Sequence, residues 1–264
     1  MDIHERFKDY KTIVVKVGTS TITYPNGNLN LRMIDRLCWM LSDLKNRDKN
    51  VVLVSSGAIG VGSKSLGFAE RPQKTREKQA AAAVGQAILM QIYQNFFNTY
   101  THTVAQILLT KNDFEKGDRK TNTENTFDEL LSRGIIPIVN ANDTTSTYEI
   151  EFSDNDRLAA NVAVLLKADL LILLTDIDAL YDSDPRQNPD AERIKIVEEI
   201  TPEIEAMAGK AGSRFSVGGM ATKVSAAKLC VKNGVDMVVA DGGDTTIIEK
   251  IVEGEDVGTL FLKV

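Results

Sequence analysis

The chain has 264 residues, 43% of them hydrophobic, which fits one large α/β domain or two small ones with a sizeable core. Its formal net charge of −6 provides no global basic surface, and this argues against nucleic acid as a partner. Only two cysteines (Cys38 and Cys230) and two histidines are present, so a disulfide framework, a Ser-His-Asp triad and a histidine-rich metal centre are not expected. No apolar run approaches the roughly 18 residues of a membrane span, and residues 1–10 are too charged for a signal peptide, so we expect a cytoplasmic protein.

The first predicted strand carries a lysine near its end. Residues 12–17 form a short β-branched run that stops at Gly18, which is typical of a central strand. Lys16 is unusual there, because lysine is rarely buried without a partner and the carboxyl end of such a strand faces the ligand crevice of open α/β sheets. The alternative is a lysine on an edge strand whose ammonium group reaches solvent.

The second predicted strand leads into a glycine-containing loop. Residues 29–46 have helical periodicity, residues 51–54 form the strand, and Ser55 to Gly62 follow it. The glycine spacing, G-x-x-G-x-G, differs from the dinucleotide-binding fingerprint. Ser56 fits either a donor to a substrate carboxylate or phosphate, or a helix cap.

The middle of the chain supplies two more strands. Residues 78–100 are predicted to be a structural helix in which Gly85 allows close packing, and residues 104–109 form the third strand. Residues 135–139 form the fourth strand, and the Asn-Ala-Asn-Asp sequence at 140–143 is predicted to lie just past its carboxyl end.

A polar helix start follows the fourth strand. Residues 148–152 alternate and predict a hairpin arm or lid, and a helix is predicted to open at residues 153–157 and to run to Leu166. Either Asp154 or Asn155 suffices as the N-cap, which leaves Asp156 in the first turn for another role. The most apolar strand, residues 170–174, is then ended by Thr175 and Asp176.

The junction at residues 216–223 suits phosphate. Its two adjacent glycines let backbone N–H groups approach an anion, a new helix offers unsatisfied N–H groups, and Lys223 in its first turn brings a positive charge. The loop does not match the Walker pattern, and a flexible surface loop before a helix is the alternative. A strand at residues 236–240, a helix at 245–253 and a strand at 259–264 complete the chain.

Alternating strands and helices predict an α/β fold, a three-layer α/β/α sandwich around a mostly parallel sheet, with the site at the carboxyl ends of the strands. The candidate site combines two lysines (Lys16 and Lys223), one carboxylate (Asp156) and glycine-rich loops, and it contains no histidine. This set fits phosphoryl transfer, which depends on positioning and charge neutralisation. A carboxylate acceptor needs no general base, because its pKa of about 4 leaves it ionised at neutral pH.

The motifs together resemble the amino acid kinase family over nearly the whole chain, and within it the glutamate 5-kinases. They are VVKVGTS at residues 14–20, SSGAI at 55–59, NAND at 140–143, SDND at 153–156, LLTD at 173–176 and GGMATK at 218–223. Gly18-Thr19-Ser20 is the discriminating detail, because many sister kinases carry a second glycine where Thr19 stands.

This resemblance implies roles for individual residues. Lys16 and Lys223 would be phosphoryl clamps oriented by Asp156, with ATP and Mg²⁺ as co-substrate and ion, and no protein metal ligand is assigned. Glutamate would be held by Ser56, Asp143 and Asn155. ATP would be held by Lys16, Thr175, Asp176, Val217, Gly218, Gly219, Met220, Ala221, Thr222 and Lys223. Val217 and Ala221 lack the hydroxyl group that is frequent at these positions, which leaves backbone contacts there.

The resemblance also implies the wider context of the reaction. The product would be glutamyl 5-phosphate, made in the first step of proline synthesis, with proline as feedback inhibitor, glutamyl phosphate reductase as a partner and a homo-oligomeric assembly. We expect a single catalytic domain with an acceptor-binding half near residues 1–165 and a nucleotide-binding half near 166–264, and without the C-terminal PUA domain of many relatives. The alternatives are an amino acid kinase acting on aspartate, acetylglutamate, carbamate or a nucleoside monophosphate, and a non-catalytic ligand-sensing module.

Overall fold

The computed structural model describes residues 3–146, 155–183, 185, 187–210 and 219–263. These residues divide into two compact units. We call residues 1–16 and 156–264 the terminal unit, and residues 17–155 the central unit. The hairpin arm or lid predicted at residues 148–152 lies outside the described residues.

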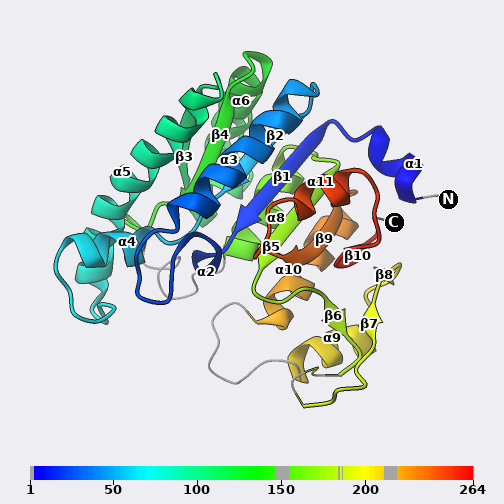
Figure 1. The fold of residues 1–264 in the computed structure, drawn as a ribbon. Helices are drawn as coiled ribbons and strands as arrows, with labels where there is room; N and C mark the ends of the chain where they lie inside the picture. The colour runs from blue at the N-terminus through cyan, green and yellow to red at the C-terminus, as the bar shows by residue number, and fades with distance from the viewer. Residues whose placement is uncertain (1–2, 147–154, 184, 186, 211–218, 264) are drawn as a thin grey trace. The chain divides into compact units, whose positions relative to one another are not determined.

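The central unit is a parallel sheet with helices packed on its strands, and it runs from blue to green in Figure 1. Its elements are α2 (Thr19–Ile22), α3 (Leu31–Asn46), β2 (Asn50–Val54), α4 (Ala58–Ser65), α5 (Thr75–Thr99), β3 (Val104–Leu109), the 3₁₀ helix η1 (Lys111–Phe114), α6 (Asp118–Ser132) and β4 (Ile136–Ala141). The strand order is β3-β4-β2, and α3, α5 and α6 contact β2, β3 and β4 respectively.

The terminal unit is built around a second run of strands in the order β1-β5-β9-β10-β8. Its elements are α1 (Ile3–Lys8), β1 (Thr12–Val17), α8 (Asn155–Leu165), β5 (Leu170–Thr175), β6 (Leu180–Tyr181), β7 (Arg193–Ile194), β8 (Ile196–Val197), α9 (Pro202–Lys210), α10 (Met220–Lys232), β9 (Asp236–Asp241), α11 (Ile247–Val252) and β10 (Thr259–Phe261). Strand β5 pairs parallel with β9, β10 pairs antiparallel with β9, and β6 and β7 form a separate hairpin. The predicted fold class, a mostly parallel sheet with flanking helices, is confirmed.

Most predicted elements are present, and their ends differ by a few residues. Strand β4 continues through Ala141 because Asn140 and Ala141 still pair with β3, so the prediction that Asn140 lies beyond the strand is wrong. Helix α10 begins at Met220, so Lys223 lies in its first turn, as predicted. Cys38 and Cys230 are buried and are not joined in a disulfide. Among the described helices, none is long and apolar enough to cross a membrane.

Both ends of the terminal unit are tied to the start of β9 by one fully buried carboxylate. The guanidinium of Arg6 donates to Asp236 through Nε at 2.7 Å and Nη2 at 3.0 Å, and the phenol of Tyr10 donates to the same carboxylate. The backbone N–H of Lys263 donates to Asp236 Oδ1 at 2.5 Å. Because Asp236 has an exposed fraction of 0%, these bonds replace the water that it loses on folding.

Helices α4 and α5 of the central unit meet backbone against backbone. A Cβ atom built on Gly62 would lie 1.8 Å from the carbonyl oxygen of Ala81, and one on Gly85 would lie 1.8 Å from that of Ala58. The prediction that Gly85 allows close packing is therefore confirmed. The crossing fixes the start of α4, which directly follows the loop that contains Ser56.

We predict that Gly85→Ala lowers the free energy of unfolding by about 1–3 kcal/mol, because the added methyl group has to push the two helices apart. Urea unfolding measures the effect. Gly60→Ala is the matched control, because a Cβ there meets nothing within 4 Å, and we expect no loss or a gain of up to about 1 kcal/mol from helix propensity. Equal unfolding midpoints for the two variants would contradict the close crossing.

Candidate active site

Three of the predicted site residues meet at one buried carboxylate in the terminal unit. Lys16 lies near the end of β1, Asp156 is in the first turn of α8, and Lys223 is in the first turn of α10. Lys16 Nζ is 2.5 Å from Asp156 Oδ1, and Lys223 Nζ is 3.2 Å from Asp156 Oδ2. The exposed fractions of Lys16, Asp156 and Lys223 are 8%, 1% and 2%. The alternative that the ammonium group of Lys16 reaches solvent is therefore wrong.

The two lysines set the pKa of Asp156 and the net charge of the cluster. Burial alone raises the pKa of Asp156, but the positive charges of Lys16 and Lys223 outweigh it, and the pKa lies below its ordinary value. Two ammonium groups and one carboxylate leave a formal charge of +1 on the cluster. A buried site with net positive charge favours an anionic ligand, such as the phosphates of a nucleotide.

Thr222 is a further partner of Asp156 that the sequence did not indicate. Its Oγ1 lies 3.1 Å from Asp156 Oδ2 and 2.8 Å from the carbonyl oxygen of Gly219, so its single proton is shared between two acceptors. The sequence placed Thr222 only in the ATP loop. Its position one residue before Lys223 gave no sign that the hydroxyl faces Asp156.

The other residues predicted to hold ATP lie partly in the described terminal unit. Thr175 is the last residue of β5 and is buried, and its hydroxyl donates to the exposed Asp176 at 3.0 Å. Gly219 precedes α10, the side chain of Met220 is buried, and Ala221 is exposed. Val217 and Gly218 lie outside the described residues.

Two of the residues predicted to hold glutamate contact each other in the central unit. Asn155 Nδ2 lies 2.8 Å from Ser56 Oγ and 2.8 Å from the carbonyl oxygen of Ser55. It also lies 3.3 Å from Asn140 Oδ1, a longer contact. Because α8 begins at Asn155 itself, the N-cap role considered for this residue does not apply.

The third predicted glutamate residue, Asp143, lies two positions past β4 in the same unit, with an exposed fraction of 8%. Asn140 had no role assigned from the sequence, although a polar side chain with an exposed fraction of 5% inside an apolar strand is a signal of its own. The structure therefore adds Asn140 to the polar side chains around Ser56 and Asn155.

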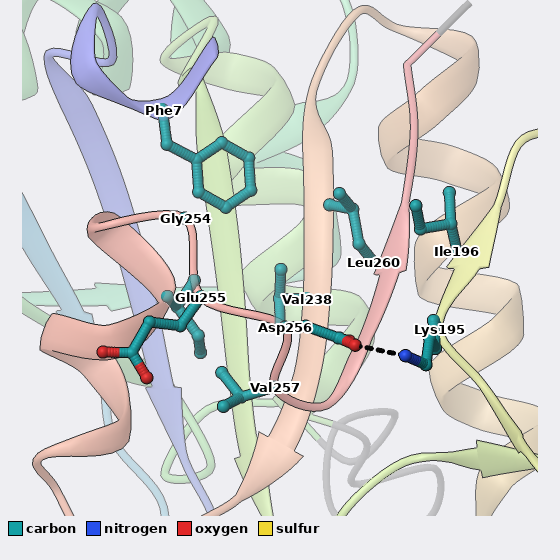
Figure 2. A pocket seen from close by; sticks show the side chains of 10 residues that line it. Phe7, Lys195, Ile196, Val238, Gly254, Glu255, Asp256, Val257 and Leu260 are labelled. Atoms are coloured by element: carbon teal, nitrogen blue, oxygen red, sulfur yellow. Dashed lines mark ion pairs between the residues drawn. The ribbon is translucent and has the colours of Figure 1, made fainter. Parts of the chain in front are cut away.

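A separate hollow of about 240 Å³ lies in the terminal unit and contains none of the predicted site residues. Figure 2 shows Phe7, Val238 and Leu260 around it. An ion pair between Lys195 and Asp256 at 2.6 Å lies among its lining residues, which are mainly apolar. Its lining does not resemble that of an anion site.

Comparisons with known proteins agree with this geometry. Residues 11–241 match the model of the amino acid kinase family. A glutamate 5-kinase of Clostridium perfringens is 54% identical over 264 residues, which cover 98% of this chain and 98% of that protein. One of Listeria monocytogenes is 50% identical over 263 residues, which cover 98% of this chain and 95% of that protein.

A solved structure extends the comparison to the fold. The crystal structure of UMP kinase from Bacillus anthracis matches with a TM-score of 0.66 and covers 96% of each chain. Its sequence identity of 14% makes this a likeness of fold alone. With the family model covering most of its length and relatives identical at half of their positions, the chain belongs to the amino acid kinase family.

Proposed function

We propose that the chain catalyses the ATP-dependent phosphorylation of the γ-carboxylate of L-glutamate to L-glutamyl 5-phosphate, the first step of proline synthesis. The observation that carries the proposal is the buried Asp156 held between Lys16 and Lys223. Two fixed ammonium groups suit the charge that spreads over a transferring phosphoryl group. The choice of glutamate is supported by the two relatives named glutamate 5-kinase.

In this reaction an oxygen of the γ-carboxylate attacks the γ-phosphorus of ATP. The new oxygen–phosphorus bond forms as the bond to the bridging β,γ-oxygen breaks, and ADP leaves with that electron pair. Lys16 and Lys223 neutralise the phosphoryl oxygens, and Asp156 holds the two ammonium groups beside one another through its two oxygens. No proton has to be removed from the acceptor, because a carboxylate is ionised at neutral pH.

The acceptor is held by the polar residues of the central unit in this proposal. Ser56 provides its hydroxyl group for a carboxylate of glutamate, the Asn155 amide orients that hydroxyl, and Asp143 provides a negative charge for the amino group of glutamate. The contact between Ser56 and Asn155 in the central unit supports this, because it fixes the direction of the Ser56 hydroxyl.

The nucleotide is held by residues of the terminal unit. We assign Thr175, Asp176 and the loop at 217–223 to ATP, with backbone N–H groups before α10 facing the phosphates. Mg²⁺ enters as part of the substrate, carried by these phosphates. The oxygens of Asp156 already accept from Lys16, Lys223 and Thr222, so we give this carboxylate an organising role and not that of a metal ligand.

Further features stay proposals from the resemblance to the family. These are a homo-oligomeric assembly, feedback inhibition by proline, hand-over of the labile acyl phosphate to a reductase, and acceptor and nucleotide halves near residues 1–165 and 166–264. A ligand sensor on the same fold is a weaker candidate, because a sensor has no need of two buried lysines around one carboxylate.

An acceptor panel tests the proposal. We expect ADP release in the presence of ATP and Mg²⁺ to depend on glutamate, with a kcat/KM well above that for aspartate, acetylglutamate, carbamate or a nucleoside monophosphate. Each assay is repeated with proline to test feedback inhibition. A higher kcat/KM for another acceptor assigns the chain to a different kinase activity, and tight ATP binding without transfer to any acceptor favours the sensor.

We predict that Lys223→Ala lowers kcat by about 10²–10³, the usual loss for one preorganised charge contact to the transition state. Steady-state kinetics measures kcat, and circular dichroism checks the fold. Lys228→Ala is the matched control, because Lys228 lies on the same helix with its side chain 61% exposed and pairs with Glu205. Near-normal turnover of Lys223→Ala would rule out its role as a clamp.

We predict that Asp156→Asn lowers kcat by a similar factor without loss of ATP binding, and that it changes stability in a pH-dependent way. Because the folded pKa of Asp156 lies below its ordinary value, its stabilisation is complete above the unfolded pKa of about 4 and is lost as the pH falls through the folded pKa. The cost of the substitution is expected to be about 3–5 kcal/mol at neutral pH and to shrink in acid.

Urea unfolding of the wild type and of Asp156→Asn between neutral pH and pH about 3 measures this difference. Asp43→Asn serves as the control, because its ion pair with Arg47 is partly exposed and is expected to contribute less than about 1 kcal/mol. A stability difference for Asp156→Asn that stays constant into acid would contradict the assignment of an ionised carboxylate between the lysines.

A further inference from the structure

The turn that carries Ser56 contacts a buried phenol on helix α5. Tyr93 lies on α5 with an exposed fraction of 1%, and its hydroxyl is 2.9 Å from the hydroxyl of Ser55. The backbone N–H of Ser55 donates to the carbonyl oxygen of Val139 at 2.9 Å, which attaches the same residue to β4. Ser55 is therefore fixed by its side chain and by its backbone, to two different elements.

The direction of the phenol bond follows from counting protons. Burial raises the pKa of Tyr93 above its ordinary value, so the phenol keeps its proton at neutral pH. Ser55 is its one hydrogen-bond partner among the described residues, whereas Ser55 Oγ also has the carbonyl oxygen of Ser56 at 3.4 Å. With Tyr93 as donor both protons have an acceptor, and the reverse assignment leaves a buried phenol proton without one.

The neighbouring serine is oriented by the same network. The carbonyl oxygen of Ser55 and the hydroxyl oxygen of Ser56 both accept from the amide of Asn155, each at 2.8 Å. Ser56 Oγ thus accepts a bond from within the protein, and its own proton is directed to a different partner. A carboxylate oxygen of the substrate is a suitable acceptor for it.

The backbone after Ser56 is also constrained, so it has little room to adjust if Ser55 moves. Gly57 adopts φ +91°, which favours glycine, and a Cβ there would lie 3.3 Å from Ile22 Cδ1. Gly85, on the same helix as Tyr93, rests against the carbonyl of Ala58 at the start of α4. Helix α5 therefore supports the turn on both sides, at Ser55 through Tyr93 and at Ala58 through Gly85.

From these contacts we infer that Tyr93 is a positioning residue for the acceptor: its phenol fixes Ser55 and thereby aims the Ser56 hydroxyl at the substrate carboxylate. The inference rests on the proposed function, since it concerns the glutamate side of that reaction. Tyr93 itself touches neither substrate nor nucleotide in this scheme. Its loss should weaken glutamate binding and leave the handling of ATP unchanged.

Tyr93→Phe tests the inference, because it removes only the hydroxyl group. We expect the KM for glutamate to rise about 2- to 10-fold, the factor that corresponds to one internal hydrogen bond, with the KM for ATP unchanged. Tyr100→Phe is the matched control: Tyr100 follows the same helix, and its phenol donates to Asp35 at 2.7 Å, away from the turn. We expect its KM values to equal those of the wild type.

A double-mutant cycle with Ser55→Ala asks whether Tyr93 acts through Ser55. Either substitution removes the same bond, so the double variant should raise the KM for glutamate no further than the larger of the two single effects. Ser55→Ala also provides the test if Tyr93→Phe does not fold.

The outcomes separate this inference from the proposed function. A wild type that phosphorylates glutamate, together with a Tyr93→Phe variant of unchanged glutamate KM, overturns the role of Tyr93 and leaves the function standing. Equal changes in both KM values, or fully multiplicative effects of the two substitutions, also overturn it, since they indicate a purely structural contribution. A wild type without glutamate-dependent ADP release rejects the proposed function itself.

Discussion

A buried carboxylate shared by two ammonium groups is the interaction on which the terminal unit's polar interior depends. Without Asp156, Lys16 and Lys223 would be two like charges in a buried site. In general, two like charges about 4 Å apart repel each other by about 4 kcal/mol at an effective dielectric constant of 20. Asp156 contacts both ammonium groups, and the three side chains together carry a formal charge of +1. A buried cluster of this charge favours an anionic ligand.

The uncharged polar residues around Ser56 in the central unit are held by hydrogen bonds and not by ion pairs. Ser55, Ser56, Asn140 and Asn155 carry no formal charge, and their positions are fixed by hydrogen bonds and by close backbone contact. Hydrogen bonds depend strongly on direction, so such a network suits a substrate whose orientation has to be controlled. Charge organises the first cluster and hydrogen-bond geometry organises the second.

Local sequence reveals some of these residues and hides others. Lys16 stands out as a charged residue in a β-branched strand, and Lys223 stands out as a lysine in the first turn of a helix that follows two glycines. Both can therefore be recognised from the sequence. Tyr93 fits the apolar face of a helix, and Ser55, its partner 38 positions away, leaves no trace in that pattern. The same holds for Thr222, whose hydroxyl faces Asp156 across 66 positions. Contacts of this kind depend on tertiary packing, which periodicity does not record.

The crossing of α4 and α5 also limits how the acceptor turn is able to change. At Gly62 and Gly85 the two backbones touch with no side chain between them, so there is no group to shorten, lengthen or reshape at that contact. An alteration of substrate preference on this scaffold therefore has to come from residues of the turn and its hydrogen-bond partners. The helices beneath behave as a fixed platform, and an engineer gains more from varying Ser56 or Asn155 than from repacking below them.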